Sequence, residues 1–110
     1  MSGALNIFKT VTANLTTVTT SVYSTPLGYA TVVLMAQVAN TGNSTIQIAA
    51  ELFRSGNTTA LVQGISVPAS DAIGLLTGRL IMNFGDSLDV YSSDNTSGQL
   101  TLSILETLVG

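Results

Sequence analysis

The sequence predicts an all-β fold: a single antiparallel β-sandwich of about eight strands, jelly-roll-like, forming one domain over residues 1–110. Hydroxyl and β-branched residues dominate, and turn-forming residues recur about every ten positions, the spacing typical of sandwiches and barrels. No stretch of a dozen residues shows a helical stripe that is free of β-branched interruption. The short connections favour antiparallel neighbours, because parallel strands need long crossovers.

The N-terminal half is expected to hold strands at residues 5–13, 16–24 and 30–39, with a break near 14–17 and a turn at 25–29. In the first strand Ile7 and Lys9 share one face and Phe8 lies opposite. In the third strand, one expected face contains Val32, Leu34, Ala36 and Val38, and the other contains Val33, Met35 and Gln37. Two apolar faces predict a central strand, or one that a neighbouring subunit covers.

The middle of the chain is expected to form a hairpin. Residues 45–53 alternate, with Ile46, Ile48, Ala50 and Leu52 facing inward and Gln47, Ala49 and Glu51 facing outward. A tight turn at 55–58 follows, because Gly56 and Asn57 tolerate positive φ. Residues 59–67 return as the partner strand.

The C-terminal half is expected to hold strands at 75–84, 87–92 and 100–108, with loops at 68–71 and 94–98 and a turn at 85–86. Asp71 is placed to cap a short helical turn at 72–74, which Gly74 keeps short. In the strand at 75–84, alternation places Leu80 and Met82 on one face and Ile81 and Asn83 on the other. In the strand at 87–92, it places Leu88 and Val90 on one face and Asp89 and Tyr91 on the other.

Composition argues against most enzyme and cofactor classes. The chain has no Cys and no His, so it has no disulfide, no thiolate nucleophile and no Ser-His-Asp triad. Lys9 is the sole lysine and stands in no SxxK spacing, and neither a P-loop nor a GxGxxG fingerprint occurs. Three cations and a net charge of −3 argue against nucleic-acid binding, which needs basic charge. We therefore expect a protein that is not an enzyme and takes no cofactor.

Neither a membrane anchor nor an export signal is expected. The longest apolar stretch, residues 29–39, is shorter than the roughly 20 residues of a membrane-spanning helix. The first residues, Met-Ser-Gly-Ala-Leu-Asn, have neither the basic region nor the apolar core of a secretory signal. We expect a chain made in a cytoplasm that has no membrane partner.

Three aspartates form the first candidate site. Asp86, Asp89 and Asp94 lie within nine positions and carry the oxygen ligands that Ca²⁺ prefers. Asp86 and Asp89, however, are three apart across a turn-to-strand junction, which usually divides side chains between faces. No calcium-loop motif is present, so we expect turn and solubility roles and no metal site.

Two glutamates form the second candidate site. Glu51 and Glu106 would be an acid and base pair of a glycosidase if the fold brought them about 5–9 Å apart. The chain has no Trp platform for sugars. We expect both to be outward-facing strand carboxylates, paired with Arg54 or Arg79, and expect no catalytic residue.

Three tyrosines form the third candidate site. Tyr23, Tyr29 and Tyr91 are the side chains that would stack on sugars in a carbohydrate-binding module. Two of them flank turns, where Tyr often packs its ring inward and leaves its hydroxyl in water. We expect that structural role instead.

The scarcity of charge is the most informative feature of the composition. Only 8% of the residues are charged, against about 25% in ordinary globular proteins. Wide stretches of surface must then be made of Thr, Ser, Asn, Gln and apolar groups, and β-rich edges of this kind pair with other chains unless covered. We expect a homo-oligomer or a subunit covered by partners. The alternative is a soluble monomer with a neutral, Thr-rich surface.

Several segments carry a resemblance to a known group of proteins: TVTANL at 10–15, VYSTPLGY at 22–29, VANT at 38–41, VPASD at 67–71, LLTGRL at 75–80, GDSLDV at 85–90 and LTLSILE at 100–106. With these the chain resembles small β-sandwich virion structural proteins, decoration or tail-associated, of tailed cyanobacterial and marine phages. The matching segments are turn and strand signatures. The resemblance therefore implies a fold and a place in a particle but no reacting residues.

Together these observations predict a non-enzymatic phage virion structural protein, made in the host cytoplasm and located in the virion. Its expected role is a capsid decoration (cement) protein that stabilises the head through subunit contacts. Its expected partners are copies of itself, with a trimer favoured, and the major capsid protein or other virion proteins. A tail, neck or fibre component is the alternative, followed by a carbohydrate-binding module.

Overall fold

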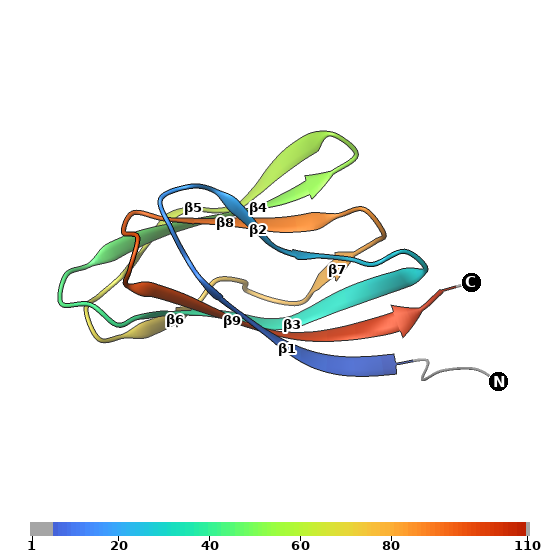
Figure 1. The fold of residues 1–110 in the computed structure, drawn as a ribbon, viewed down its shortest axis with the longest axis horizontal. Helices are drawn as coiled ribbons and strands as arrows, with labels where there is room; N and C mark the ends of the chain where they lie inside the picture. Colours follow the sequence, from blue (N-terminus) through green and yellow to red (C-terminus); the bar gives the residue numbers. More distant parts are fainter. Residues whose placement is uncertain (1–5, 110) are drawn as a thin grey trace.

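Two antiparallel sheets pack face to face in the computed structural model, which describes residues 6–109 (Figure 1). Sheet A contains β1 (Asn6–Asn14), β9 (Gly98–Leu108), β3 (Tyr29–Asn40), β6 (Ala72–Gly74) and β7 (Leu80–Met82). Sheet B contains β2 (Thr20–Ser24), β8 (Ser87–Ser92), β4 (Ile46–Arg54) and β5 (Asn57–Val67). These described residues contain no helix long and apolar enough to cross a membrane.

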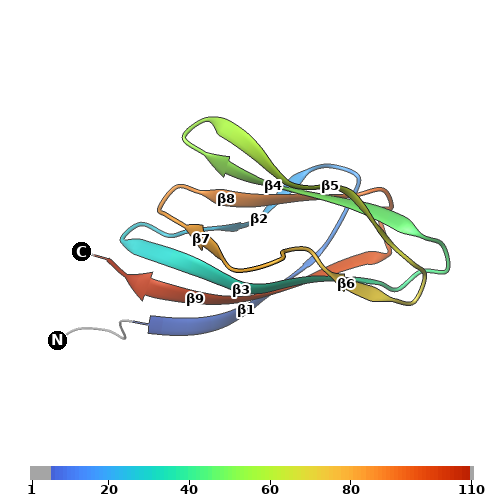
Figure 2. The ribbon, with the colours of Figure 1, turned by 180° about the vertical axis from the view of Figure 1, so that it is seen from behind.

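The strand order is that of a jelly roll. Pairing runs from the ends of the chain inward: β1 with β9, β2 with β8, β3 with β6 and β7, and β4 with β5. This is one long folded hairpin, and its wrapping brings β9 beside β3 and β8 beside β4. Both β6 and β7 pair with β3, so the nine described strands fill eight positions (Figure 2). The predicted all-β sandwich is confirmed.

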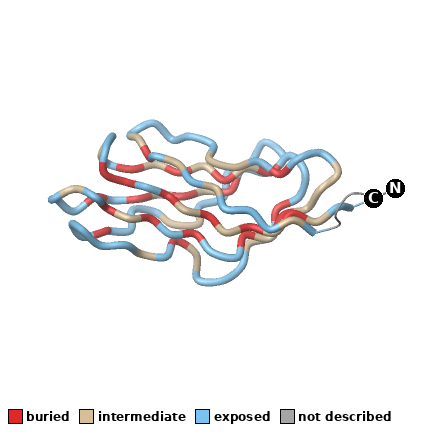
Figure 3. The backbone as a smooth tube through the Cα atoms, turned by 60° about the horizontal axis from the view of Figure 1, so that its bottom comes forward, coloured by how far each residue is buried: buried red, intermediate tan, exposed pale blue. Residues whose placement is uncertain are grey.

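The core lies between the sheets and follows the period-two alternation of each strand. In β4 the four predicted inward residues are buried: Ile46, Ile48, Ala50 and Leu52. Strands β8 and β9 add Leu88 and Val90, then Leu100, Leu102 and Ile104. Figure 3 shows buried stretches along the strands and exposed turns at both ends. The alternation arises because successive side chains of a strand point to opposite faces.

Strand β3 departs from its predicted alternation. Val33, Ala36 and Val38 are buried, whereas Leu34 and Met35 are partly exposed. The pairing with β9 shifts register between Val33 and Met35, which marks a β-bulge. A bulge adds one residue to one strand and so reverses which parity faces the core. The prediction that Val32 and Leu34 share the face of Ala36 and Val38, with Val33 on the opposite face, was therefore wrong.

The segment that precedes β8 also departs from prediction. Residues 72–74 form strand β6 beside β3 rather than a helical turn, and Asp71 instead accepts a hydrogen bond from the Ala72 amide at 2.8 Å. Of the expected strand 75–84, only β7 pairs with β3. Five residues, 75–79, lie opposite the three residues 34–36 of β3, so the segment must loop out.

Most of the remaining strand boundaries lie within two residues of the predicted ones, and the second strand is the exception. The second strand begins at Thr20 rather than at residue 16, and residue 5 of the first expected strand lies outside the described residues. The predicted hairpin turn closes on Ser55 and Gly56, with φ of 52° and 80°. Positive φ at both central residues matches the right-handed twist of paired strands.

Candidate functional site

The three aspartates considered for calcium do not meet. Asp86 is buried and binds the Arg54 guanidinium, with Nε donating at 2.9 Å, and the Asn83 amide at 2.8 Å. Asp89 accepts from the Ser87 hydroxyl, and Asp94 accepts from Ser97 within its own loop. The described residues contain no group of three metal-ligating side chains. Each aspartate has a structural partner nearby.

Hydrogen bonds favour the ionised form of two of these aspartates. Hydrogen bonds from Arg54 lower the pKa of Asp86, and burial only partly opposes this effect. The Ser97 hydroxyl and the Thr96 amide lower the pKa of Asp94. Both carboxylates thus remain charged at neutral pH, with their oxygens held by the local fold.

The two glutamates lie in different sheets and do not form an acid and base pair. Glu51 faces outward from β4, where it is the cross-strand partner of Asp89. Glu106 lies on the inner face of β9 and is buried, so the prediction of an outward position was wrong for it. Its ion pair is with Lys9, at 2.9 Å, rather than with Arg54 or Arg79.

A polar chain runs through one end of the sandwich around Glu106. The Tyr23 hydroxyl donates to Glu106 Oε2 at 2.5 Å and lies 2.8 Å from the Thr31 hydroxyl, which also accepts from Thr25 at 3.1 Å. Burial raises the pKa of Glu106, but hydrogen bonds from Tyr23 and Lys9 outweigh burial and leave the pKa below its usual value. This hydrogen-bond network joins β2 of sheet B to β9 and β3 of sheet A.

This polar chain is satisfied internally. In the part of the chain that the structure describes, every buried side-chain nitrogen or oxygen has a hydrogen-bond partner. The Thr25 amide continues the network to the Asp86 carbonyl at 3.1 Å, and Asp86 binds Arg54. Buried polar networks of this kind stabilise a unique arrangement when every member is paired. The network ties the two sheets together at this end of the sandwich.

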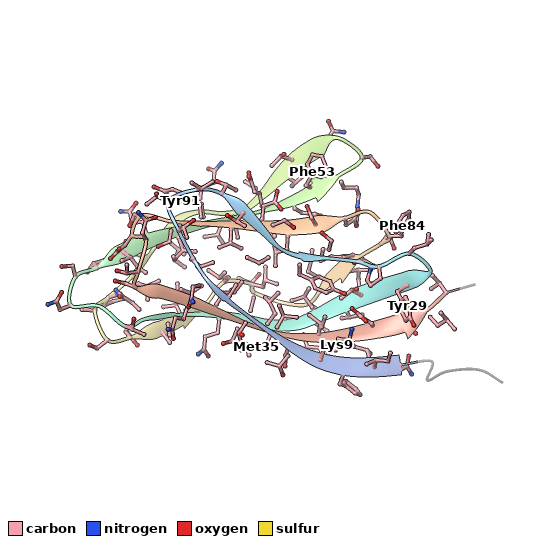
Figure 4. The ribbon with its side chains drawn as sticks, viewed as in Figure 1. Lys9, Tyr29, Met35, Phe53, Phe84 and Tyr91 are labelled. Carbon is pink, nitrogen blue, oxygen red and sulfur yellow. The ribbon has the colours of Figure 1, made fainter. Side chains whose placement is uncertain are left out.

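The three tyrosines do not form a platform for sugars. Tyr23 is half-buried, and its hydroxyl is bonded to Glu106 rather than to water. Tyr29 and Tyr91 lie at opposite ends of the sandwich (Figure 4). Stacking on one sugar chain would require aromatic faces that lie side by side. The predicted structural role fits Tyr23, although the expectation of a solvent-exposed hydroxyl was wrong for it.

The outer face of sheet A carries an apolar row that crosses four strands. Strand register places Phe8 of β1 beside Leu105 of β9, Leu105 beside Val32 of β3, and Val32 beside Ile81 of β7. Phe8 is 74% exposed and Ile81 is 54% exposed, and the two residues between them are half-buried. An uncovered apolar row of this length is typical of a contact surface.

The bulge of β3 enlarges this row. Leu34 and Met35 lie beside it and are 36% and 40% exposed. Figure 4 shows Met35 on the side of sheet A that points away from sheet B. The bulge that reversed the predicted alternation thus places two more large apolar side chains on the outside of the sheet.

The outer face of sheet A has no charged residue among the described positions. Besides the apolar row with Leu34 and Met35, it consists of Asn6, Thr10, Thr12, Asn14, Ala30, Gln37, Ala39, Ala72, Gly74, Gln99, Thr101, Ser103 and Thr107. The outer face of sheet B differs, because it carries the neighbouring carboxylates of Glu51 and Asp89. The few charges of the chain are therefore kept off one whole face, and we take the outer face of sheet A as the candidate functional site.

Two hollows on the surface hold no arrangement of reactive groups. A groove of about 390 Å³ lies between β5 and the loop before β7 and is mostly apolar, with Leu61, Val62 and Leu76 in its lining. A hollow of about 320 Å³ lies over β1 and β9, between Thr12 and Gln99. The second hollow lies within the polar half of the candidate face.

Sequence reasoning identified some members of this face, but it placed Val32 and Leu34 on the side of Ala36 and Val38, and it did not identify the face itself. Alternation correctly placed Phe8 opposite Ile7, and Ile81 opposite Leu80 and Met82. The low charge predicted a surface suited to neighbours. The side-by-side position of Phe8 and Ile81 depends on pairing between strands that lie far apart in sequence, and no local signal carries it.

Comparison with known proteins shows the fold. No protein-family model and no curated protein matches the sequence. A protein of the Bacillus endospore appendages, which form disulfide-linked pili, has a TM-score of 0.55 at 12% identity, over 96% of this chain and 88% of that chain. The nucleoplasmin-like N-terminal domain of Drosophila FKBP39 has a TM-score of 0.51 at 14% identity, over 100% and 98%.

A chain of the IBDV viral particle has a TM-score of 0.50 at 12% identity, over 99% of this chain and 37% of that chain. At such identities the likeness concerns the fold alone. The same sandwich occurs in a pilus, in a nucleoplasmin-like domain and in a viral particle. The chain therefore has a β-sandwich fold that is found in a viral particle.

Proposed function

We propose that this chain is a non-enzymatic virion structural protein that acts by contact with neighbouring subunits. The observation that carries the proposal is the outer face of sheet A, which combines an exposed apolar row with a complete lack of charge among the described residues. The cores of protein interfaces are likewise depleted of charged residues and enriched in aromatic ones. Phe8, the most exposed member of the row, is the aromatic anchor that such an interface needs.

The energetics favour contact over chemistry. Burying apolar surface stabilises an assembly by about 25 cal/mol per Å². Burying a charge opposes assembly unless the charge is paired, and this face holds none. Two of the acids that a reaction could use are instead held in ion pairs, Glu106 with Lys9 and Asp86 with Arg54.

Within this role we propose a head decoration (cement) protein that forms a homo-oligomer, with a trimer as the proposed number. Its contacts with the major capsid protein, repeated over many copies, would stabilise the shell against the pressure of packaged DNA, because ligands that bind only the assembled state shift the equilibrium toward it. The sequence resemblance to phage virion proteins supports this role. The occurrence of the fold in a viral particle is compatible with it.

Purified virions whose genome encodes this chain provide the test. Mass spectrometry should find the protein at high copy number if it decorates the head, and at low copy number if it belongs to a tail, neck or fibre. Its absence from the particle would overturn the virion role. A glycan array tests the carbohydrate-binding alternative, with Tyr91→Ala as the control variant, and we expect no binding from either protein.

A further inference from the structure

We infer that the partner seated on the outer face of sheet A is a second copy of this chain. The inference deepens the proposed function and rests on it, because the proposed function already makes this face a contact surface. It adds the identity of the partner on this face. The proposed function allows either a second copy of this chain or another virion protein there. Four properties of the described residues support a like copy: the continuity of the apolar row, the distribution of charge, the size of the face, and the state of the sheet edges.

The apolar row is one continuous strip. Phe8, Leu105, Val32 and Ile81 follow one another across four adjacent strands, which lie about 4.8 Å apart. Leu34 and Met35 widen the strip at its centre. The same strip on a second copy matches it in length and in apolar character. A face that meets itself relates two copies by a two-fold axis, so this contact is separate from the three-fold contacts of the proposed trimer.

The charge distribution favours a like partner on this face. The chain has a net charge of −3, so two copies repel each other where they meet through a face that carries the excess acidic side chains. The outer face of sheet B presents Glu51 beside Asp89 and would place carboxylates against carboxylates. The outer face of sheet A has no charge at the described positions, so two copies meet there without that repulsion.

The size of the face suits a stable interface. Three strands about 4.8 Å apart with nine residues of about 3.4 Å each, and the six residues of β6 and β7 at the fourth position, give a flat area of about 540 Å². Side-chain relief makes the accessible area larger. A standard interface buries about 800 Å² on each partner, so this single face approaches the area that a specific contact needs.

The sheet edges are poor alternatives for joining two copies. Strand β2 is short and bulged, β5 carries two register shifts against β4, and the β6 and β7 edge is interrupted. Strand β1, with nine residues, is the uninterrupted edge of sheet A, and its Lys9 points inward to Glu106. Short edges, bulges and inward-pointing charges are the devices that prevent edge pairing. Contact through the face is therefore favoured over extension of a sheet.

Sedimentation velocity over protein concentrations of about 1 to 100 µM tests the inference. The unmodified chain should sediment as two or more copies. Ile81→Asp should raise the dissociation constant by about tenfold or more, because each copy would then bury a charge. Val18→Asp is the matched control: Val18 is 69% exposed and lies outside the face, so this variant should assemble like the unmodified chain.

Two further comparisons make the result decisive. Met35→Asp introduces a charge from a different strand of the same face and should dissociate the assembly as Ile81→Asp does, while urea unfolding shows that both variants remain folded. A chain that is monomeric at every concentration, or variants that assemble like the unmodified chain, would overturn the inference. Virion mass spectrometry tests the virion role separately from the self-contact. If the protein is monomeric in solution but present in virions, only the inference of a self-contact is overturned. If it is oligomeric in solution but absent from virions, only the virion role is overturned.

Discussion

The hydroxyl of Tyr23 donates a hydrogen bond to Glu106 across the interior, joining the edge strand of one sheet to the central part of the other. The two residues are far apart in sequence, and neither was expected to bind the other. Lys9 binds the second oxygen of the same carboxylate. One buried acid is thereby shared by three strands, β1, β2 and β9, and it fixes how they meet at this end of the sandwich.

Removal of this hydroxyl should destabilise the fold. Tyr23→Phe leaves a buried oxygen of Glu106 without its donor, and an unpaired buried group costs about 1–3 kcal/mol. We expect the free energy of unfolding, measured in urea, to fall by that amount. Tyr91→Phe is the control, because Tyr91 lies on an outer face, and its stability should change by less than about 0.5 kcal/mol. Equal stability of Tyr23→Phe and the unmodified chain would contradict the bond.

The same tyrosine should make the fold sensitive to alkali. Burial, followed by the hydrogen bond to Glu106, raises the pKa of Tyr23 from 10.0 to about 12. A group whose folded pKa is raised stabilises the fold below its unfolded pKa and loses that contribution as the pH rises through the folded value. Stability should therefore decline between about pH 10 and pH 12. Urea unfolding across this range should show a weaker decline for Tyr23→Phe.

The buried acids should make the fold sensitive to low pH. The pKa values of Asp86 and Glu106 lie below the usual values in the folded chain. Such groups stabilise the fold above their unfolded pKa, about 4, and lose that contribution as the pH falls through the folded value. The free energy of unfolding should stay constant from about pH 6 to 8, since the chain has no His, and should fall below about pH 4.

The double variant Asp86→Asn with Glu106→Gln is the comparison for this acid transition. It should be less stable at neutral pH, and its stability should depend less steeply on pH below about 4, because its two amides do not titrate. Circular dichroism with urea at each pH measures both quantities. An unchanged acid slope in the double variant would show that other carboxylates control the transition.

Shortening a core side chain should cost more than shortening a partly exposed one. Leu102 is fully buried between the sheets, and Leu102→Ala should destabilise the chain by about 2–5 kcal/mol through lost burial and a cavity. Ile65 is 36% exposed on β5, so Ile65→Ala should cost less. Urea unfolding of both variants measures the difference. Similar losses would mean that the packing of β9 differs from the arrangement described.

The hairpin turn between β4 and β5 offers a stabilising change. Ser55 holds a φ of 52°, a conformation that Asn adopts more readily than Ser, and Gly56 follows it with a φ of 80°. Ser55→Asn creates the Asn-Gly pair favoured in two-residue turns and should raise stability by about 0.5–1 kcal/mol. Gly56→Ala should lower it by about 1–2 kcal/mol. Thermal unfolding of the two variants should therefore shift in opposite directions.

Much of the fold could be predicted because its signals are local. The alternation of residues 45–53 depends only on successive side chains pointing to opposite faces, and its inward members are buried as expected. The turn at Ser55 and Gly56 follows from the conformations that these residues allow. The absence of His and Cys and the scarcity of charge were likewise plain in the sequence and directed attention to contact rather than chemistry.

Tertiary pairing decided what the local pattern left open. The bulge between Val33 and Met35 depends on how β3 meets β9, and it reversed the alternation that the sequence predicted for Leu34. The apolar row depends on register between strands that lie far apart in the chain, which places Phe8 and Ile81 on one face. Composition alone determined that this protein has few charges to place. Only the long-range register, set by the packing of two sheets, decided that one whole described face would have none.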